Sequence, residues 1–246
     1  MEWIDRGLVL SHRPFGESGT IAQLLTREHG RHAGLVRGGS RTRAQIQPGT
    51  RVQAVWRARL ADHLGNWTLE PERSGLAGVI DDPPRLAALV SACAVLEAAL
   101  PERQPMSGVF DATESLLDAL EGDVWDAAYV GWELGLLGAL GFGLDLTRCA
   151  ATGATAELTH VSPRTGRAVS AGAAAPYADR LLPLPGFLIG RGEASPEAVL
   201  AGLDLTGHFL ERRLFAQSHL PVPPARTRHV EAYRVRIARS GMNPES

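Results

Sequence analysis

The chain lacks lysine altogether, so all 25 of its fixed basic side chains are arginine. This absence excludes Schiff-base chemistry at a lysine, a Walker phosphate-binding loop and a serine–lysine nucleophile pair. Every fixed cation is a planar guanidinium, which suits phosphate and carboxylate partners. Biased codon usage also explains the absence of lysine, and the three exclusions hold under either explanation.

Cysteine is also scarce, because Cys93 and Cys149 are the only two in 246 residues. Two cysteines do not make a disulfide framework, which indicates a reducing cytoplasmic compartment. No apolar run reaches the roughly 18 residues of a membrane span, and the acidic residues 1–5 are unlike a secretory signal. We expect a cytoplasmic protein that does not contact membranes.

Recognised catalytic motifs are missing as well. The sequence contains no His-Glu-x-x-His, no Gly-x-Ser-x-Gly and no cysteine–histidine constellation. One set of acids, Asp111, Glu114, Asp118 and Glu121, follows helical spacing. Such a ribbon is either a solvated helix face or a docking surface for a basic partner. We expect no enzymatic activity and no cofactor.

Charge is distributed in three blocks behind a net value of −2. Residues 1–60 hold ten arginines against four acids, residues 76–140 hold two against eleven, and residues 212–239 hold seven against one. Two separate basic blocks around an acidic middle indicate different partners for different surfaces.

The first 75 residues carry strand patterns. In residues 50–60, the side chains of one face are Val52, Ala54, Trp56, Ala58 and Leu60, and those of the other are Arg51, Gln53, Val55, Arg57 and Arg59. The first face is therefore predicted to be buried and the second to present three arginines to solvent. Residues 7–11, 21–26, 34–37 and 67–70 are predicted as further strands between turn-forming residues. Five short strands at this spacing predict a small closed barrel of the OB type.

From about residue 81 the hydrophobic period becomes helical. Helices are predicted from Asp81-Asp82-Pro83 to Pro101, around residues 109–120, and from a cap at Asp123 to Leu140. Gly131, Gly135 and Gly138 in the third helix predict a closely packed neighbour. Residues 145–190 lose the helical period and are predicted to be an irregular segment with a short hairpin at 158–169. Two further helices are predicted, one at 195–217 with a break near Gly207 and one at 226–239. The fold class expected is α+β and multi-domain. The barrel domain is placed at residues 1–78 and a mostly helical domain at 79–246.

Five short stretches, taken together in their order and spacing, resemble the RecO family of bacterial recombination mediators. They are Gly-Leu-Val-Leu at 7–10, Phe-Gly-Glu-Ser at 15–18, Leu-Leu-Thr-Arg-Glu-His-Gly at 24–30, Gly-Gly-Ser-Arg at 38–41, and residues 161–169. The resemblance spans residues 7–240. It implies an OB barrel before a helical domain, binding of single- and double-stranded DNA, annealing of complementary strands, and nucleoid association. It also implies help in loading recombinase onto coated DNA, with RecR and the acidic tail of single-strand binding protein as partners.

Arginines of the barrel are the predicted DNA contacts, because OB barrels hold a nucleic-acid backbone in a cationic groove and stack bases on aromatic rings. The predicted set is Arg13, Arg37, Arg41, Arg43, Arg51, Arg57 and Arg59, with Phe15 as a stacking residue. The carboxy-terminal arginines are predicted to hold a second strand or an acidic peptide through bidentate pairs. They are Arg212, Arg213, Arg226, Arg228, Arg234 and Arg236, with Arg239 added for the second strand.

A structural zinc is common in the RecO family, and the resemblance places its four cysteine slots in the degenerate zinc-finger-like segment 145–178. Here the slots hold Cys149, Thr152, Ser170 and Ala173. Structural zinc requires four soft or imidazole ligands. We therefore expect no metal.

An alternative function stays open. An OB barrel also serves as an RNA-binding or protein-adaptor module without annealing activity, and nothing in the residues separates RNA contacts from DNA contacts. Stoichiometry with RecR and oligomeric state are not given by the sequence.

Overall fold

The computed structural model describes residues 1–17, 19–38, 44–60, 63–72 and 77–241. The chain forms two compact units, Met1–Gly122 with Pro223–Arg226, and Asp123–Val222 with Thr227–Ser246. The first unit contains a closed barrel, and the second contains helices and a small three-stranded sheet. The predicted α+β class, with an OB-like barrel before a helical region, is confirmed. The predicted domain boundary between residues 78 and 79 stays a prediction.

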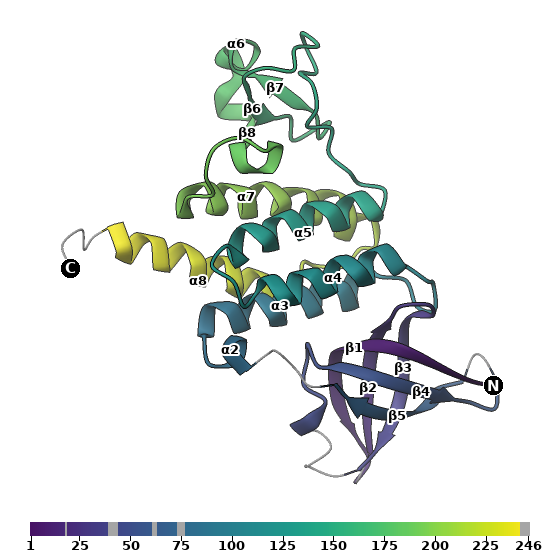
Figure 1. The fold of residues 1–246 in the computed structure, drawn as a ribbon. Helices are drawn as coiled ribbons and strands as arrows, with labels where there is room; N and C mark the ends of the chain where they lie inside the picture. The colour runs from purple at the N-terminus through teal and green to yellow at the C-terminus, as the bar shows by residue number, and fades with distance from the viewer. Residues whose placement is uncertain (18, 39–43, 61–62, 73–76, 242–246) are drawn as a thin grey trace. The chain divides into compact units, whose positions relative to one another are not determined.

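The barrel has five strands: β1 (Glu2–Phe15), β2 (Gly19–Thr26), β3 (Gly30–Arg37), β4 (Arg51–Arg57) and β5 (Gly65–Pro71). They close in the order β1-β2-β3-β5-β4, and the β3–β5 pair is the parallel one (Figure 1). β1 is much longer than predicted because it serves two neighbours. Residues 2–8 pair with β4, and residues 7–15 pair with β2.

Alternation in β4 sets the barrel core as expected, because Val52, Ala54 and Trp56 are buried. The strand nevertheless ends at Arg57, and Leu60 is 56% exposed, so the predicted extension to residue 60 is wrong. Ala58 donates its N–H to the Met1 carbonyl at 3.0 Å. That bond is the last rung at the barrel rim, and the chain then leaves the sheet.

Two glycines allow the tryptophans into this core. A Cβ on Gly65 would lie 2.1 Å from the Trp56 ring, and one on Gly34 would lie 2.5 Å from the Trp67 ring. Neither glycine therefore accepts a side chain without moving an indole. The remaining buried side chains of this core are aliphatic: Val9, Ala22, Leu24, Val36, Ile46, Val52 and Ala54.

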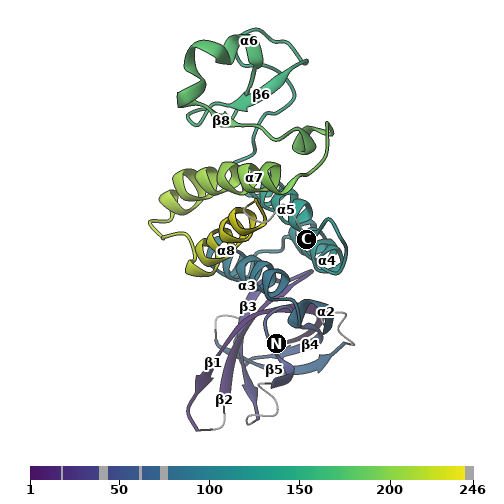
Figure 2. The same ribbon diagram turned by 90° about the vertical axis from the view of Figure 1, so that its left-hand side faces the viewer.

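After the barrel strands, the described part of residues 72–122 contains the helices α2 (Ala77–Ile80), α3 (Pro83–Ala99) and α4 (Ser107–Ala119). The Asp82 side chain caps α3 by accepting from the Arg85 N–H at 3.2 Å, as the Asp-Asp-Pro start predicts. α3 packs against β1 and α4 contacts β2, so both helices cover part of the barrel (Figure 2).

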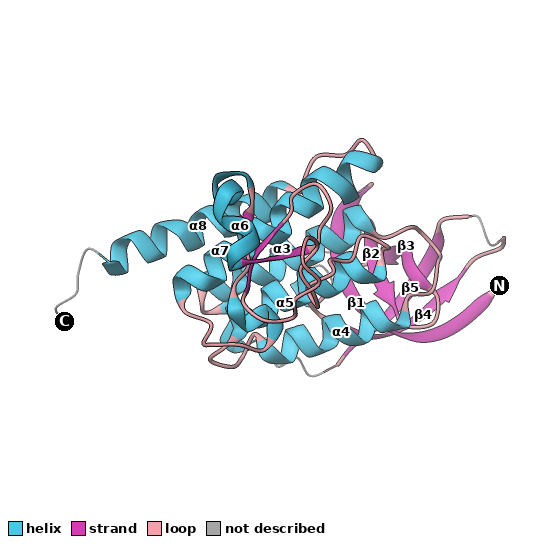
Figure 3. Cartoon of the chain, turned by 90° about the horizontal axis from the view of Figure 1, so that it is seen from above, coloured by secondary structure: helices cyan, strands magenta, loops and turns pink. Residues whose placement is uncertain are grey.

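The second unit is built on α5 (Trp125–Ala139), α7 (Pro196–Phe209) and the part of α8 (Pro224–Gly241) from Thr227 onward. α7 continues as a π-helical turn, η3 (Leu210–Phe215), and α5 packs against α7 (Figure 3). A small sheet of order β7-β6-β8 holds the predicted hairpin, with β6 (Leu158–Val161), β7 (Ala168–Ser170) and β8 (Leu182–Pro183). The short elements α6 (Ala171–Ala174), η1 (Ala175–Arg180) and η2 (Gly186–Ile189) accompany it.

Three local predictions in the second unit are wrong. Gly131, Gly135 and Gly138 face open space, with no described atom within 4 Å of a Cβ built there, because they form the exposed stripe of α5 opposite Trp132 and Leu136. The residue that caps α5 is Val124, without a side-chain hydrogen bond, and not Asp123. The helix also continues through Gly207. No helix in the described ranges is both long and apolar enough to cross a bilayer.

Candidate nucleic-acid interface

The β1–β2 hairpin brings three predicted contact residues onto one sheet face. Phe15 pairs with Gly19, and Gly19 pairs with Arg37 across β2 and β3. Arg13 lies two residues before Phe15 on β1, so its side chain occupies the same face. Arg13 and Arg37 are exposed, and Phe15 is 50% exposed. An accessible ring and two guanidinium groups therefore lie within a few strand spacings of each other.

A hollow of about 530 Å³ begins beside Arg37. Its polar lining comes from Gln45, Asn66 and Thr68, and its apolar floor includes Leu35 and Trp67. A second hollow of about 420 Å³ is lined by Arg57 and Arg59 and shares Asn66 with the first. The two hollows therefore meet at Asn66.

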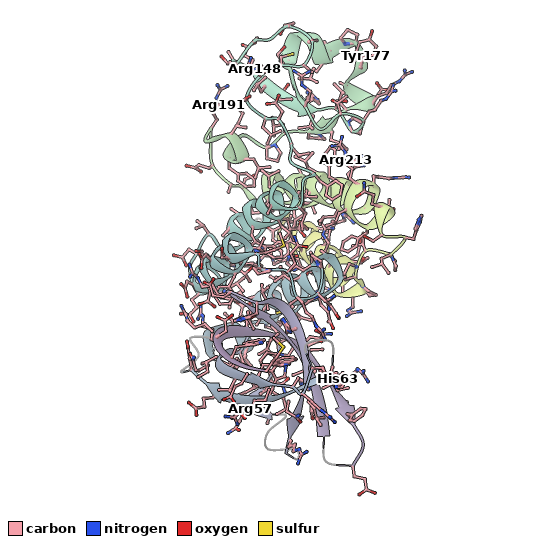
Figure 4. All side chains as sticks on the ribbon, turned by 90° about the vertical axis from the view of Figure 1, so that its right-hand side faces the viewer. Arg57, His63, Arg148, Tyr177, Arg191 and Arg213 are labelled. Carbon is pink, nitrogen blue, oxygen red and sulfur yellow. The ribbon has the colours of Figure 1, made fainter. Side chains whose placement is uncertain are left out.

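Sheet register explains this junction. Asn66 pairs with Leu35 on β3 and with Arg57 on β4. These three residues lie side by side across the sheet and connect the first hollow to the second. We call the surface from Arg37 through Asn66 to Arg57 and Arg59 the track. It combines guanidinium groups, amide and hydroxyl groups, and an apolar floor. Figure 4 shows Arg57 on the outside of the barrel.

Charge along the track is open to a ligand. Within the described residues, no ion pair is found for Arg13, Arg37 or Arg59. Arg57 pairs with Glu2 at 2.7 Å, and this hydrogen bond lowers the pKa of the Glu2 carboxyl. Both side chains of this pair are more than half exposed, where ion pairs contribute little. A phosphate group therefore competes readily with Glu2 for Arg57.

Arg51 departs from the predicted set. Its side chain is 14% exposed, and its guanidinium binds Glu114 at 3.1 Å and Asp118 at 2.6 Å on α4. Burial lowers its pKa, but attraction to these two carboxylates outweighs burial and raises it. The face predicted to be solvated is covered by a helix here. Arg41 and Arg43 lie outside the described residues.

Asn66, Thr68 and Gln45 are track residues that the sequence reasoning missed. The signal was available for two of them, because Asn66 and Thr68 flank the buried Trp67 in an alternating strand and so point outward. Gln45 carries no pattern that singles it out.

The six arginines predicted for the partner site divide into two groups. Arg212 and Arg228 are exposed, and Arg213 lies over the Phe209 ring with a bond to the Arg164 carbonyl at 2.9 Å. The other three are engaged within the fold. Arg226 is buried, Arg234 pairs with Asp204 at 2.9 Å, and Arg236 binds Asp126 and lies over the rings of Trp125 and Tyr233.

Three of the four predicted zinc slots, Cys149, Thr152 and Ser170, interact with one another but do not form a zinc ligand set. Cys149 is buried, and its sulfur accepts hydrogen bonds from the Ser170 N–H at 3.3 Å and the Ser170 hydroxyl at 3.4 Å. Bonds from Ser170 and Thr152 lower the pKa of the Cys149 thiol to about 6. One thiol and two hydroxyls do not fit a structural zinc. Among the described residues, no three His, Cys, Asp or Glu side chains gather around a common metal position.

The fold and the track together define a class: α+β proteins in which an OB-type barrel with an open cationic surface precedes a helical region. Residues 1–71 match the family model described as Recombination protein O N terminal, and residues 80–219 match Recombination protein O C terminal. The chain belongs to the RecO family.

Named relatives agree over nearly the whole length. The DNA repair protein RecO of Rhodospirillum centenum is 57% identical over 248 residues, covering 99% of each chain. The DNA repair protein RecO of Rhodospirillum rubrum is 52% identical over 244 residues, covering 95% of this chain and 97% of the relative. That of Phenylobacterium zucineum is 52% identical over 230 residues, covering 92% and 95%. The protein therefore has a role in DNA repair and recombination.

Proposed function

We propose that the barrel binds single-stranded DNA along the track and that the protein anneals complementary strands. The observation that supports this most is the meeting of two hollows at Asn66, with Arg37 at one end and Arg57 and Arg59 at the other. Guanidinium groups neutralise phosphates, and an apolar floor suits the faces of the bases. Phe15 provides a stacking ring beside Arg37.

Annealing requires a second surface that screens a second polyanion. Among the described residues, the best candidates for this surface are the exposed Arg212 and Arg228, with Arg239 near the end of α8. They would bind a second strand, duplex DNA or an acidic peptide. The proposed partners are RecR and the acidic tail of single-strand binding protein, with which the protein helps load recombinase onto coated DNA. We propose that it acts at the cytoplasmic nucleoid without enzymatic activity and without a cofactor.

The first test replaces the track arginines. We expect the triple variant R37A/R57A/R59A to bind a labelled single-stranded oligonucleotide more weakly at every sequence, because phosphate contacts carry no base preference. Since each lost phosphate contact removes about 0.7 from the slope of log K against log salt, the slope should flatten by up to about 2. Fluorescence titration over a series of salt concentrations measures both quantities.

A matched control carries the same change in charge away from the barrel. R148A/R164A/R180A removes three exposed arginines of the second unit, and it should leave the slope nearly unchanged. Equal effects of the two triple variants would place the binding surface elsewhere.

The alternative function is an RNA-binding or adaptor module. Two measurements distinguish it from the proposed function: the rate of strand annealing and the relative affinity for RNA and DNA. A mediator should accelerate annealing of complementary DNA strands, whereas a passive binder leaves them unpaired. Tighter binding of RNA than of DNA of the same sequence, without faster annealing, would favour the alternative.

A further inference from the structure

A second group of arginines lies further along the same outer surface of the barrel. Arg6 on β1, Arg51 on β4 and Arg27 at the end of β2 are neighbours, since the Arg27 N–H donates to the Arg6 carbonyl and Arg51 pairs with Leu8. We call these three residues the second stripe. Four to six residues separate it from Glu2 and Arg57 along β1 and β4, which corresponds to about 13 to 20 Å.

α4 presents three carboxylates to this stripe. Asp111, Glu114 and Asp118 follow i, i+3 and i+7 spacing, so they project from one face of the helix. At 1.5 Å per residue they place three negative charges within about 10 Å. That spacing, about one charge per 5 Å, is of the same order as the 3.4 Å per charge of one DNA strand.

Every arginine of the second stripe is paired with this helix. Arg27 forms a two-pronged pair with Asp111, with Nε–Oδ1 at 2.9 Å and Nη2–Oδ2 at 3.0 Å. Arg6 binds Glu114 at 3.0 Å. Arg51 binds Glu114 and Asp118, as described above. The helix therefore contacts the stripe as a phosphate backbone would.

This contact is fixed and does not resemble a mobile gate. Val109, Phe110, Leu116 and Leu117 of α4 are buried. Removing the helix would expose these side chains, each worth roughly 1.5–3 kcal/mol of burial. DNA is therefore not expected to displace α4. A phosphate that approaches Arg6, Arg27 or Arg51 meets three carboxylates on a fixed helix, whereas one that approaches Arg57 meets the single carboxylate of Glu2.

We propose that α4 is an internal polyanion that ends the DNA track: its carboxylates occupy Arg6, Arg27 and Arg51 and keep the phosphodiester backbone from extending along β1 and β4. The helix thus limits the number of phosphates that the barrel engages. This proposal rests on the proposed function, because it assumes that the open track binds DNA.

Two variants of the full-length protein test it. D111N/E114Q/D118N removes the charges of the helix but keeps Glu72, 3.8 Å from Arg6, and Glu28, 2.9 Å from Arg27. The variant should steepen the salt slope for a labelled thymidine oligonucleotide by up to about 2 and raise affinity about tenfold at low salt. The matched control D81N/E121Q/D123N changes net charge equally at exposed acids, and it should leave the slope as in the unmodified protein. Equal slopes for these two variants overturn the proposal.

The second variant, R6Q/R27Q, removes arginines of the second stripe and leaves the acids of α4 in place. It is informative even if D111N/E114Q/D118N does not fold. These arginines are already neutralised, so the slope of the otherwise unmodified protein should not change. A flatter slope would overturn the proposal, because it would mean that DNA reaches them behind α4. In the D111N/E114Q/D118N background the same pair should remove about two thirds of the gain, because Arg51 remains available.

The two levels of inference fail differently. If the unmodified protein binds no DNA, the proposed function and the role of α4 both fail. If it binds DNA with a salt-dependent affinity but R6Q/R27Q flattens the slope, the track stands and only the role of α4 is lost.

Discussion

His32 occupies the aromatic end of the barrel core. Its ring lies 5.5 Å from the Trp56 ring and 5.1 Å from the Trp3 ring, while Trp3 stacks on His29 at 3.9 Å. Burial, assisted by the positive charges of Arg103 and His29, lowers the pKa of His32 to about 4. Glu102 opposes this shift. The imidazole is therefore neutral in the folded protein at neutral pH.

This residue makes stability depend on pH. An unfolded histidine binds its proton near pH 6.5, whereas His32 in the fold binds it near 4. Between these values the unfolded chain holds the extra proton, so the free energy of unfolding should fall as pH decreases from about 6.5 to 4, by up to about 3 kcal/mol. Urea titrations across this range measure the loss. His32→Phe should reduce the slope in this window, and an unchanged slope would assign the effect to other groups.

Among the helices and strands, sequence periodicity predicted well where the pattern itself is local. The alternation of β4 and the Asp-Asp-Pro start of α3 both gave the observed element. The length of β1 was not predictable, because its two halves pair with strands distant in sequence. For the same reason the glycine stripe of α5 was misread, since composition alone does not say whether small residues face a neighbour or solvent.

The candidate site shows the same division. Exposed arginines such as Arg37 and Arg59 were identified from type and position. The pairing of Arg51 with α4 depends on tertiary contact between segments 63 residues apart, so a strand pattern could not give it. Asn66 gained its place only when β5 closed the barrel beside β3.

The small sheet of the second unit should be stable without metal. We expect chelator treatment to leave the thermal midpoint unchanged, because the four predicted zinc slots hold one thiol, two hydroxyl groups and the methyl group of Ala173. Cys149→Val should lower the free energy of unfolding by about 1–3 kcal/mol, since it leaves the buried Ser170 N–H without its acceptor. Cys149→Ser keeps an acceptor and should cost less. Thermal unfolding with zinc analysis measures both, and a chelator-induced drop would contradict the expectation.

Across the whole molecule, the net charge of a sequence block overstates the number of arginines that are free to bind a polyanion. Eight of the ten arginines in residues 1–60 are described, and five of them, Arg6, Arg27, Arg31, Arg51 and Arg57, pair with carboxylates. Four of these five, all except Arg57, pair with acids of residues 76–140, so the basic block and the acidic middle partly cancel within the first unit. Arg57 pairs with Glu2 of its own block. Net charge by sequence segment is a poor measure of the surface that a polyanion meets.

The salt dependence of the full-length protein should reflect this cancellation. If Arg13, Arg37, Arg57 and Arg59 act together with Arg41 and Arg43, six phosphates give a slope of about −4 on single-stranded DNA. Participation of the three arginines under α4 as well would bring it to about −6. Titration of the unmodified protein over a range of salt distinguishes the two values, and the steeper one would argue against cancellation by α4.

The junction of β3 and β5 has three residue pairs, against six or more at every other junction of the barrel. It is therefore the joint at which the cylinder opens most easily. The first hollow lies across this joint, with Leu35 on one side and Asn66 on the other. A bound oligonucleotide would bridge both edges and so favour the shut cylinder by mass action. If the track binds DNA as proposed, occupancy and integrity of the barrel are linked, and the unliganded protein opens locally at this joint more readily.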